Sequence, residues 1–248
     1  MVHLTLEKLV KVCDKMSSWE RFVIFLAELA GTSTFVLLGC LGCVSGSPEI
    51  ITFGFGFAIM ICVQVFGHIS GAHVNPAVTV AAAIFGNISL INVPIYIVAQ
   101  IFGAICGFEL LKILVKNHEN DVPNLCSPNP NPNLNSVQIF LSEFLLTLVL
   151  IWVCCGIWDL RNKNRSDSIP LRLGLAVTGL AMAGITLSGA HMNPARSFGP
   201  ALLNNGTWDY QWAYWAGPLF AGVIGPLIYK IVFLQIKEDA KGCSEDNP

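Results

Sequence analysis

Six long apolar runs, separated by short polar segments, dominate the pattern of this chain. They occupy residues 22–44, 50–66, 93–115, 137–158, 171–187 and 212–234. A hydrocarbon layer of about 30 Å needs roughly 20 apolar residues in a helix, so each run predicts a membrane-spanning helix. Two further helix-like segments, 75–85 and 193–203, have only about half that length and predict helices that enter a membrane without crossing it.

The composition leads to the same expectation. Hydrophobic residues make up 54% of the 248 residues and charged residues 12%, about half of the roughly 25% that is usual in soluble proteins. So few charges cannot cover a water-facing surface, and a net charge of -2 gives no support to nucleic-acid binding. The nine cysteines fall mostly inside apolar runs, and we interpret them as small hydrophobic residues rather than as a disulfide or zinc framework.

An eight-residue motif occurs twice, 118 positions apart. The segment SGAHVNPA at 70–77 and the segment SGAHMNPA at 188–195 differ only at Val74 and Met192. The chain is therefore a duplication. Because each half carries three predicted spans, the second copy must enter the membrane inverted relative to the first.

The basic residues predict the orientation of these repeats. Eleven of the fourteen Lys and Arg residues lie before the first run, between the fourth run and the start of the fifth, or from the end of the sixth run onwards. By the positive-inside rule, both termini are expected in the cytoplasm. The expected layout is a cytoplasmic N-terminal segment 1–21, a first repeat 22–116, an extracellular linker 117–135, a second repeat 136–234 and a cytoplasmic tail 235–248.

The two short segments begin with the tripeptides Asn75-Pro76-Ala77 and Asn193-Pro194-Ala195. Asn is a favoured helix N-cap and Pro a favoured first helical residue, so each Asn should begin a half-helix. If the half-helices meet end to end, the asparagine amides are free to donate into a central cavity. The carbonyl groups expected on its wall are those of Gly71, Ala72, His73, Gly189, Ala190 and His191.

Such a cavity suits small neutral molecules in single file. The positive ends of two half-helices would repel cations and protons. Arg196 adds a fixed positive charge one turn into the second half-helix. Since a cation at bilayer depth costs about 2.5 to 3.5 kcal/mol, we interpret Arg196 as a pore residue.

With these two motifs in a six-span chain, the sequence resembles the aquaporin, or major intrinsic protein, superfamily from about residue 20 to residue 234. The resemblance implies an all-α membrane protein with six transmembrane helices, two re-entrant half-helices and inverted three-helix repeats, the hourglass fold. It also implies a pore in each protomer, a homotetramer in the lipid bilayer and a plasma-membrane location. The selectivity filter that it implies consists of Phe55, Ala181, Ala190 and Arg196.

Ala181 is the informative departure within this filter. Members of the family that are strict water channels usually have His there, so Ala181 predicts a wider, less hydrophilic constriction that admits glycerol and urea as well as water. Ser197, Ala201, Tyr214 and Trp215 nevertheless resemble water channels, and the combination is similar to the insect entomoglyceroporins. The alternatives are a strict water-selective aquaporin and a junction or adhesion protein with little channel activity.

Two glutamates and two histidines occur at equivalent positions of the two halves. We interpret Glu28 and Glu143 as structural carboxylates that accept hydrogen bonds from the backbone before each Asn-Pro-Ala. His73 and His191 could suggest a metal pair, but no Cys or carboxylate completes a ligand set, and histidines that brace the pore loops are favoured. No catalytic arrangement is recognisable, so the chain is not expected to be an enzyme or to bind a cofactor or metal.

Overall fold

The computed structural model describes residues 16–115, 124–204 and 208–234. The regular secondary structure of this part of the chain is all helical, without a strand. Its α-helices are α2 (Ser18–Cys43), α3 (Pro48–Ser70), α4 (Pro76–Phe85), α5 (Val93–Leu114), α6 (Ser136–Trp158), α7 (Ile169–Gly184), α8 (Pro194–Leu203) and α9 (Gln211–Ile228). The short helical turns are η1 (Leu90–Asn92), η3 (Leu160–Ser168) and η4 (Tyr229–Phe233). The expected tail 235–248, residues 1–15 and the first part of the linker lie outside the described residues.

Within the described residues, five helical segments are long and apolar enough to cross a membrane. They are Ser18–Cys43, Pro48–Ser70, Leu90–Leu114, Ser136–Trp158 and Gln211–Phe233. The sixth predicted span corresponds to α7, which has 16 residues and a length of about 24 Å at 1.5 Å per residue. The half-helices α4 and α8 begin directly after Asn75 and Asn193, so the all-helical fold class expected from the sequence is confirmed.

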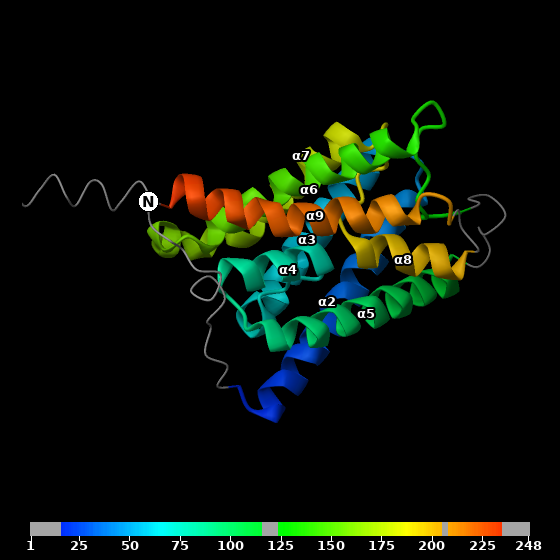
Figure 1. The fold of residues 1–248 in the computed structure, drawn as a ribbon. Helices are drawn as coiled ribbons and strands as arrows, with labels where there is room; N and C mark the ends of the chain where they lie inside the picture. The colour runs from blue at the N-terminus through cyan, green and yellow to red at the C-terminus, as the bar shows by residue number, and fades with distance from the viewer. Residues whose placement is uncertain (1–15, 116–123, 205–207, 235–248) are drawn as a thin grey trace, which may run out of the picture.

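The packing of the helices repeats between the two halves (Figure 1). In the first half α2 packs against α3 and α5, and in the second half α6 packs against α7 and α9. Each half-helix packs mainly on a span of the other repeat, α4 on α9 and α8 on α5. Each half-helix therefore depends on the last span of the other repeat for its position.

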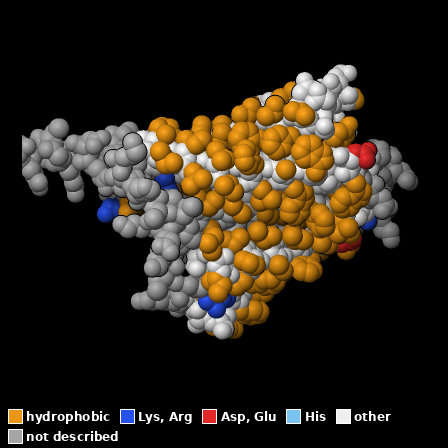
Figure 2. Space-filling view, viewed as in Figure 1, with side chains coloured by type: hydrophobic (Ala, Val, Ile, Leu, Met, Phe, Trp, Pro, Cys, Tyr) orange, Lys and Arg blue, Asp and Glu red, His pale blue; other side chains and the backbone are white. Residues whose placement is uncertain are grey.

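The two ends of the molecule differ in which segments they hold. The start of α2, the turn η3 and the end of α9 lie at one end, and the segment that leads into α6 lies at the other (Figure 1). Figure 2 shows a face whose middle is covered by hydrophobic side chains, with the visible Lys, Arg, Asp and Glu atoms near the two ends. This distribution is the one that a bilayer requires.

Local capping explains where the long helices begin. The Ser17 side chain accepts a hydrogen bond from the Glu20 backbone, and the Glu20 side chain accepts one from the Ser17 backbone. Asn135 and Gln138 form the same reciprocal pair at the start of α6. Each pair satisfies two backbone N–H groups that a helix start leaves without partners.

The contact between α3 and α7 joins the two repeats and is unusually close at Gly56. An ideal Cβ on Gly56 would lie 1.8 Å from Thr178 Oγ1 and 2.7 Å from the backbone oxygen of Gly174. The threonine side chain can rotate away, but the backbone oxygen cannot. Only a glycine therefore allows this approach of the two helices.

Gly56→Ala is expected to lower the melting temperature of the detergent-purified protein by about 2 to 10 °C. Overpacking of this kind costs about 1 to 3 kcal/mol, and each kcal/mol shifts the melting temperature of a chain of this size by about 2 to 4 °C. The matched control is Gly179→Ala on α7, where a new Cβ meets nothing within 4 Å. Differential scanning fluorimetry measures both, and a Gly56→Ala variant as stable as its control would contradict the close-packing argument.

Two cysteines differ from the sequence-based interpretation. Cys40 of α2 and Cys126 form a disulfide across 86 positions of the chain, so the prediction that no cysteine takes part in a disulfide is wrong for this pair. Cys43, Cys62, Cys106, Cys154 and Cys155 have free thiols. The pairing was missed because Cys126 lies far away in sequence, in a segment rich in Asn and Pro that carries no periodic signal.

Candidate functional site

The two half-helices begin at the centre of the molecule, and each is capped by its asparagine. Asn75 Oδ1 accepts a hydrogen bond from the Ala77 backbone at 2.9 Å. Asn193 Oδ1 accepts from the backbone N–H groups of Ala195 and Arg196 at 3.0 and 3.3 Å. The proline that follows each asparagine lacks the N–H group that would otherwise remain without a partner. The local capping chemistry predicted from the sequence is therefore present at both half-helices.

The asparagine amides also connect the two repeats. Asn75 Nδ2 donates to the carbonyl oxygen of Met192 at 2.8 Å, and Asn193 Nδ2 donates to that of Val74 at 2.8 Å. The expectation that both amide groups are wholly free is therefore wrong. An amide carries two N–H groups, so one on each asparagine remains for a molecule in the cavity.

The loops before the half-helices have an unusual backbone. Ala72 and Val74 in the first loop, and Ala190 and Met192 in the second, have φ values between 44° and 53°. This left-handed conformation costs about 1 to 2 kcal/mol for a residue with a side chain, and a β-branched residue such as Val74 is rare there. Strong hydrogen bonds must therefore hold each loop in shape.

In the first repeat those bonds converge on Glu28, which is fully buried. Its carboxyl group accepts from the backbone N–H groups of His73 and Val74 at 2.9 and 2.8 Å. The Ser70 hydroxyl donates to it at 2.6 Å and Gln100 Nε2 at 2.8 Å. The structural role expected for Glu28 agrees with this geometry.

Glu143 makes the corresponding contacts in the second repeat and is also fully buried. It accepts from the backbone N–H groups of His191 and Met192 at 2.9 and 2.7 Å and from the Ser188 hydroxyl at 2.7 Å. No amide equivalent to Gln100 contacts it, because the position 118 residues after Gln100 is Pro218. The sequence analysis missed Gln100 for the same reason, since the internal repeat does not mark it.

One tyrosine holds the start of each loop. The Tyr96 hydroxyl donates to the Ser70 carbonyl at 2.8 Å, and the Tyr214 hydroxyl donates to the Ser188 carbonyl at 2.5 Å. The two tyrosines are 118 positions apart, like the motifs that they hold. This recurrence is the signal in the sequence that could have identified them as supports of the loops.

Two cavities follow the loops from one end of the molecule towards the other. The cavity next to η3, here called the inner cavity, has a volume of about 80 Å³ and is lined by Gly71, Ala72, His73 and Asn75, among others. The second, called the outer cavity, has a volume of about 20 Å³. Since one water needs roughly 10 to 15 Å³ by this measure, the inner cavity has room for several waters and the outer one for one or two.

The outer cavity brings together the predicted filter residues. They are Phe55, Ala181, Ala190 and Arg196, and they come from α3, α7, the second loop and α8. Gly189 lines the same cavity, and His191 and Met192 line both cavities. The four positions that the family resemblance implies therefore share one narrow space.

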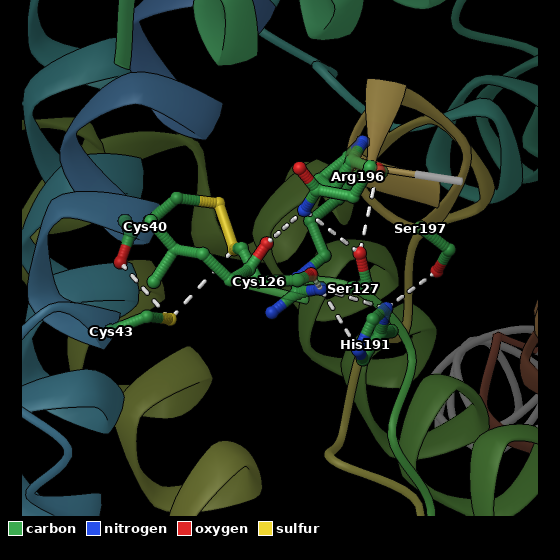
Figure 3. Close-up of a disulfide and its surroundings, with 11 residues drawn as sticks. Cys40, Cys43, Cys126, Ser127, His191, Arg196 and Ser197 are labelled. Carbon is green, nitrogen blue, oxygen red and sulfur yellow. Dashed lines mark hydrogen bonds between the residues drawn. A yellow bond between two sulfur atoms is a disulfide. The ribbon is translucent and has the colours of Figure 1, made fainter. Parts of the chain in front are cut away.

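Arg196 has three neighbours in this space and is only 6% exposed. Its guanidinium carbon lies 4.6 Å from the centre of the Phe55 ring. Its Nη1 atom donates to the carbonyl oxygen of Cys126 at 2.8 Å and lies 2.8 Å from both ring nitrogens of His191. Figure 3 shows Arg196 between Cys126 and His191.

His191 lies between Ser197 and Arg196. The Ser197 hydroxyl donates to the Asn193 carbonyl at 3.0 Å, and its oxygen lies 2.7 Å from His191 Nδ1. The imidazole therefore braces the arginine side chain against α8. No group of three or more possible metal ligands occurs among the described residues.

Comparisons with known proteins agree with this geometry. The family model described as Major intrinsic protein matches residues 15–229. "Aquaporin-4" of Mus musculus is 37% identical over 216 residues, which cover 84% of this chain and 66% of that protein. "Aquaporin-2" of Rattus norvegicus is 36% identical over 82% of this chain and 76% of its own length. The chain spans 56 to 66% of the length of the aquaporin-4 relatives that it matches.

A solved structure shows the same fold. The X-ray structure of the aquaglyceroporin from Plasmodium falciparum superimposes with a TM-score of 0.81 and covers 87% of this chain and 98% of its own. The sequence identity is 24%. The likeness therefore concerns the arrangement of the helices and says nothing by itself about which molecules pass.

Proposed function

Because the chain belongs to the major intrinsic protein family, we propose that it forms a passive pore for water and for small uncharged solutes such as glycerol and urea. The observation that carries this proposal is the pair of cavities, which share His191 and Met192, the inner one lined by both half-helix asparagines and the outer one by Arg196. Movement through such a pore follows the solute gradient and needs no chemical reaction.

The centre of the pore selects against ions and protons in this proposal. Asn75 and Asn193 each have one N–H group left after their hydrogen bond across the repeats. A water between them would accept both N–H groups and turn its oxygen towards them, which interrupts a chain of waters that could pass a proton. The positive ends of the two half-helices repel cations at the same place.

The walls give a permeant alternating polar and apolar contacts. We assign the acceptor positions to the carbonyl groups of Gly71, Ala72 and His73 in the inner cavity and of Gly189 and His191 in the outer one. The facing walls are apolar, as at Phe35 and Val177, which line both cavities. A polyol has hydroxyl groups on one side of a carbon chain, so this arrangement suits it as well as water.

The small side chains at two filter positions support the passage of solutes beyond water. Ala181 and Ala190 place only methyl groups opposite Arg196 in the outer cavity. The absence of a larger side chain at Ala181 supports the polyol-permeable reading that the resemblance to insect entomoglyceroporins implies. A strict water pore is the second candidate, and it is favoured by the His191 ring and by an outer volume of only about 20 Å³.

Ala181→His tests the choice between these two. An added imidazole should lower the glycerol permeability about tenfold or more, since one extra group in a binding space is worth about 1 to 3 kcal/mol. Water permeability should stay within about twofold of the wild-type value. Stopped-flow light scattering of proteoliposomes measures both fluxes, with Ala183→His, on the exposed side of α7, as the matched control.

The outcomes of this experiment separate all three functions. Wild-type vesicles that pass water but no glycerol or urea would establish the strict water pore. Vesicles no more permeable than empty ones would end the channel proposal and favour a junction or adhesion role. Glycerol flux in the wild type that Ala181→His leaves intact would remove Ala181 from the filter.

We also propose that the protein is a homotetramer in the plasma membrane with both termini in the cytoplasm. The Cys40–Cys126 disulfide joins the last turn of α2 to the segment that leads into α6. Figure 1 shows that segment at the end away from the start of α2 and the end of α9. Disulfides persist in oxidising surroundings such as the cell exterior. The disulfide and the distribution of basic residues therefore support the same orientation by independent physical arguments.

A further inference from the structure

The segment 124–127 connects α2 with the start and the end of α8. The Cys126 side chain is joined to α2 through the disulfide with Cys40. Asn204, just after α8, donates to the Leu125 carbonyl at 2.9 Å and to the Ser127 hydroxyl at 3.1 Å. The carbonyl of Cys126 contacts the filter arginine, as described above.

One residue thus carries both the covalent link and the contact with Arg196. The carbonyl carbon and the Cβ of Cys126 are attached to the same Cα, so a restraint on the sulfur limits where the carbonyl oxygen can point. Figure 3 shows the disulfide on one side of Cys126 and the guanidinium on the other. Beyond Cys126, the guanidinium contacts the side chains of His191 and Phe55.

The backbone at this point needs such a restraint. Cys126 has a φ of 62° and Asn124 a φ of 60°. The left-handed conformation costs about 1 to 2 kcal/mol at a residue such as Cys, and Asn tolerates it better. Without the disulfide, a change of Cys126 to another backbone conformation would lower its conformational free energy. Its carbonyl would then turn away from Arg196.

We propose that the Cys40–Cys126 disulfide is a positioning element of the selectivity filter, which keeps the Cys126 carbonyl on Arg196 and so holds the guanidinium at the edge of the lumen. The inference rests on the proposed pore function. Released from Cys126, the Arg196 side chain would sample the three staggered χ wells and spend part of its time across the lumen. The permeability to a wider solute such as glycerol should therefore fall more than the permeability to water.

Cys43 determines how the disulfide must be removed. Its sulfur lies 3.8 Å from that of Cys126, one helical turn beyond Cys40, and it could replace Cys40 as the partner in a Cys40 variant. Cys126→Ser avoids this because Cys126 is the partner common to both possible pairs, and the substitution keeps the backbone carbonyl. Cys43→Ser is the matched control, since it removes a thiol and leaves the disulfide.

Proteoliposome fluxes, divided by the amount of folded protein, test the proposal. Cys126→Ser is expected to lower the ratio of glycerol to water permeability about threefold, because the favourable one of three rotamers is then held only part of the time. Cys43→Ser should keep the wild-type ratio. A purely structural disulfide would lower the melting temperature and both fluxes together, so a ratio that is unchanged or raised in Cys126→Ser overturns the proposal.

A double-mutant cycle connects the effect to the arginine. In an Arg196→Ala background, Cys126→Ser should leave the permeability ratio unchanged, because the group that it positions is gone. A second fall of similar size in that background would overturn the proposal. Peptide mapping without reductant must also find residues 40 and 126 in one linked peptide, and two unlinked peptides would contradict the inference at its first step.

Reduction of the wild type provides the same test if Cys126→Ser does not fold. A trialkylphosphine splits the Sγ–Sγ bond into two thiols and takes up a water oxygen to become the phosphine oxide. Vesicles whose disulfide has been reduced, as shown by the mass of two alkylated cysteines, should show the lower ratio. Full reduction with the wild-type ratio overturns the proposal, whereas wild-type vesicles without any flux would instead contradict the pore function.

Discussion

Glu28→Ala is expected to prevent the protein from reaching a stable folded state in the membrane. The substitution removes the acceptor of the His73 and Val74 backbone N–H groups. It also removes the acceptor of the Ser70 hydroxyl and the Gln100 amide. Each buried donor left without a partner costs about 1 to 3 kcal/mol, so four of them cost about 4 to 12 kcal/mol. That is comparable with the whole stability of many proteins, about 5 to 15 kcal/mol.

The position of these donors makes the loss severe. The first loop lies at membrane depth, where irregular backbone is tolerated only if its polar groups are satisfied. It also contains Ala72 and Val74 in the left-handed conformation, which relaxes once the hydrogen bonds are lost. Because Asn193 donates to the Val74 carbonyl, a displaced first loop also removes a partner from the second half-helix.

The amount of protein at the cell surface and its melting temperature in detergent measure this effect. Glu109→Ala is the matched control, because Glu109 lies on α5 with an exposed side chain, and it should change the melting temperature by no more than about 2 °C. Glu28→Gln keeps one acceptor oxygen and should fall between the two. A Glu28→Ala protein with normal yield and stability would show that the carboxyl group does not hold the loop.

Arg196→Ala is expected to increase the leak of protons and small cations through the proposed pore. A unit charge about 4 Å from a passing cation raises its energy by about 4 kcal/mol at an effective dielectric constant of 20. Every 1.4 kcal/mol is a factor of about ten, so loss of the guanidinium can raise cation entry by up to about a thousandfold. The half-helix ends remain and keep the actual increase below this limit.

Water flux should survive the same substitution, because the walls of the outer cavity stay in place and the space becomes larger. A pH-sensitive dye inside proteoliposomes, with a potassium diffusion potential across the membrane, measures the proton leak. Arg196→Lys is the control that keeps the charge and loses the planar fork. Equal proton leaks in the wild type and in Arg196→Ala would mean that the arginine does not form the electrostatic barrier.

The sequence alone was sufficient for features that depend on neighbouring residues. The apolar runs predicted the spans, and the motifs around Asn75 and Asn193 predicted two half-helices that the structure contains. Both features follow from local physics, because a cap is formed by residues two or three positions apart. The internal repeat also identified Glu28 and Glu143 as equivalent residues.

Contacts between distant segments could not be predicted from the sequence. The asparagine amides were expected to be free, although each donates to a carbonyl of the other repeat, 117 or 119 positions away. The Cys40–Cys126 disulfide and the amide of Gln100 beside Glu28 were not expected either. Cys126 lies in an irregular segment, and Gln100 has no counterpart in the second half, so neither periodicity nor repetition marks them.

The amino-acid sequence by itself determined the helical membrane architecture, the duplication and the starts of the half-helices, because apolar length and capping act within a few residues. Only the tertiary structure decided which groups surround Arg196. Its contacts with Cys126, His191 and Phe55 come from separate elements. They arise when the crossed packing of α4 on α9 and α8 on α5 closes the two repeats around one space, and no local pattern encodes that closure.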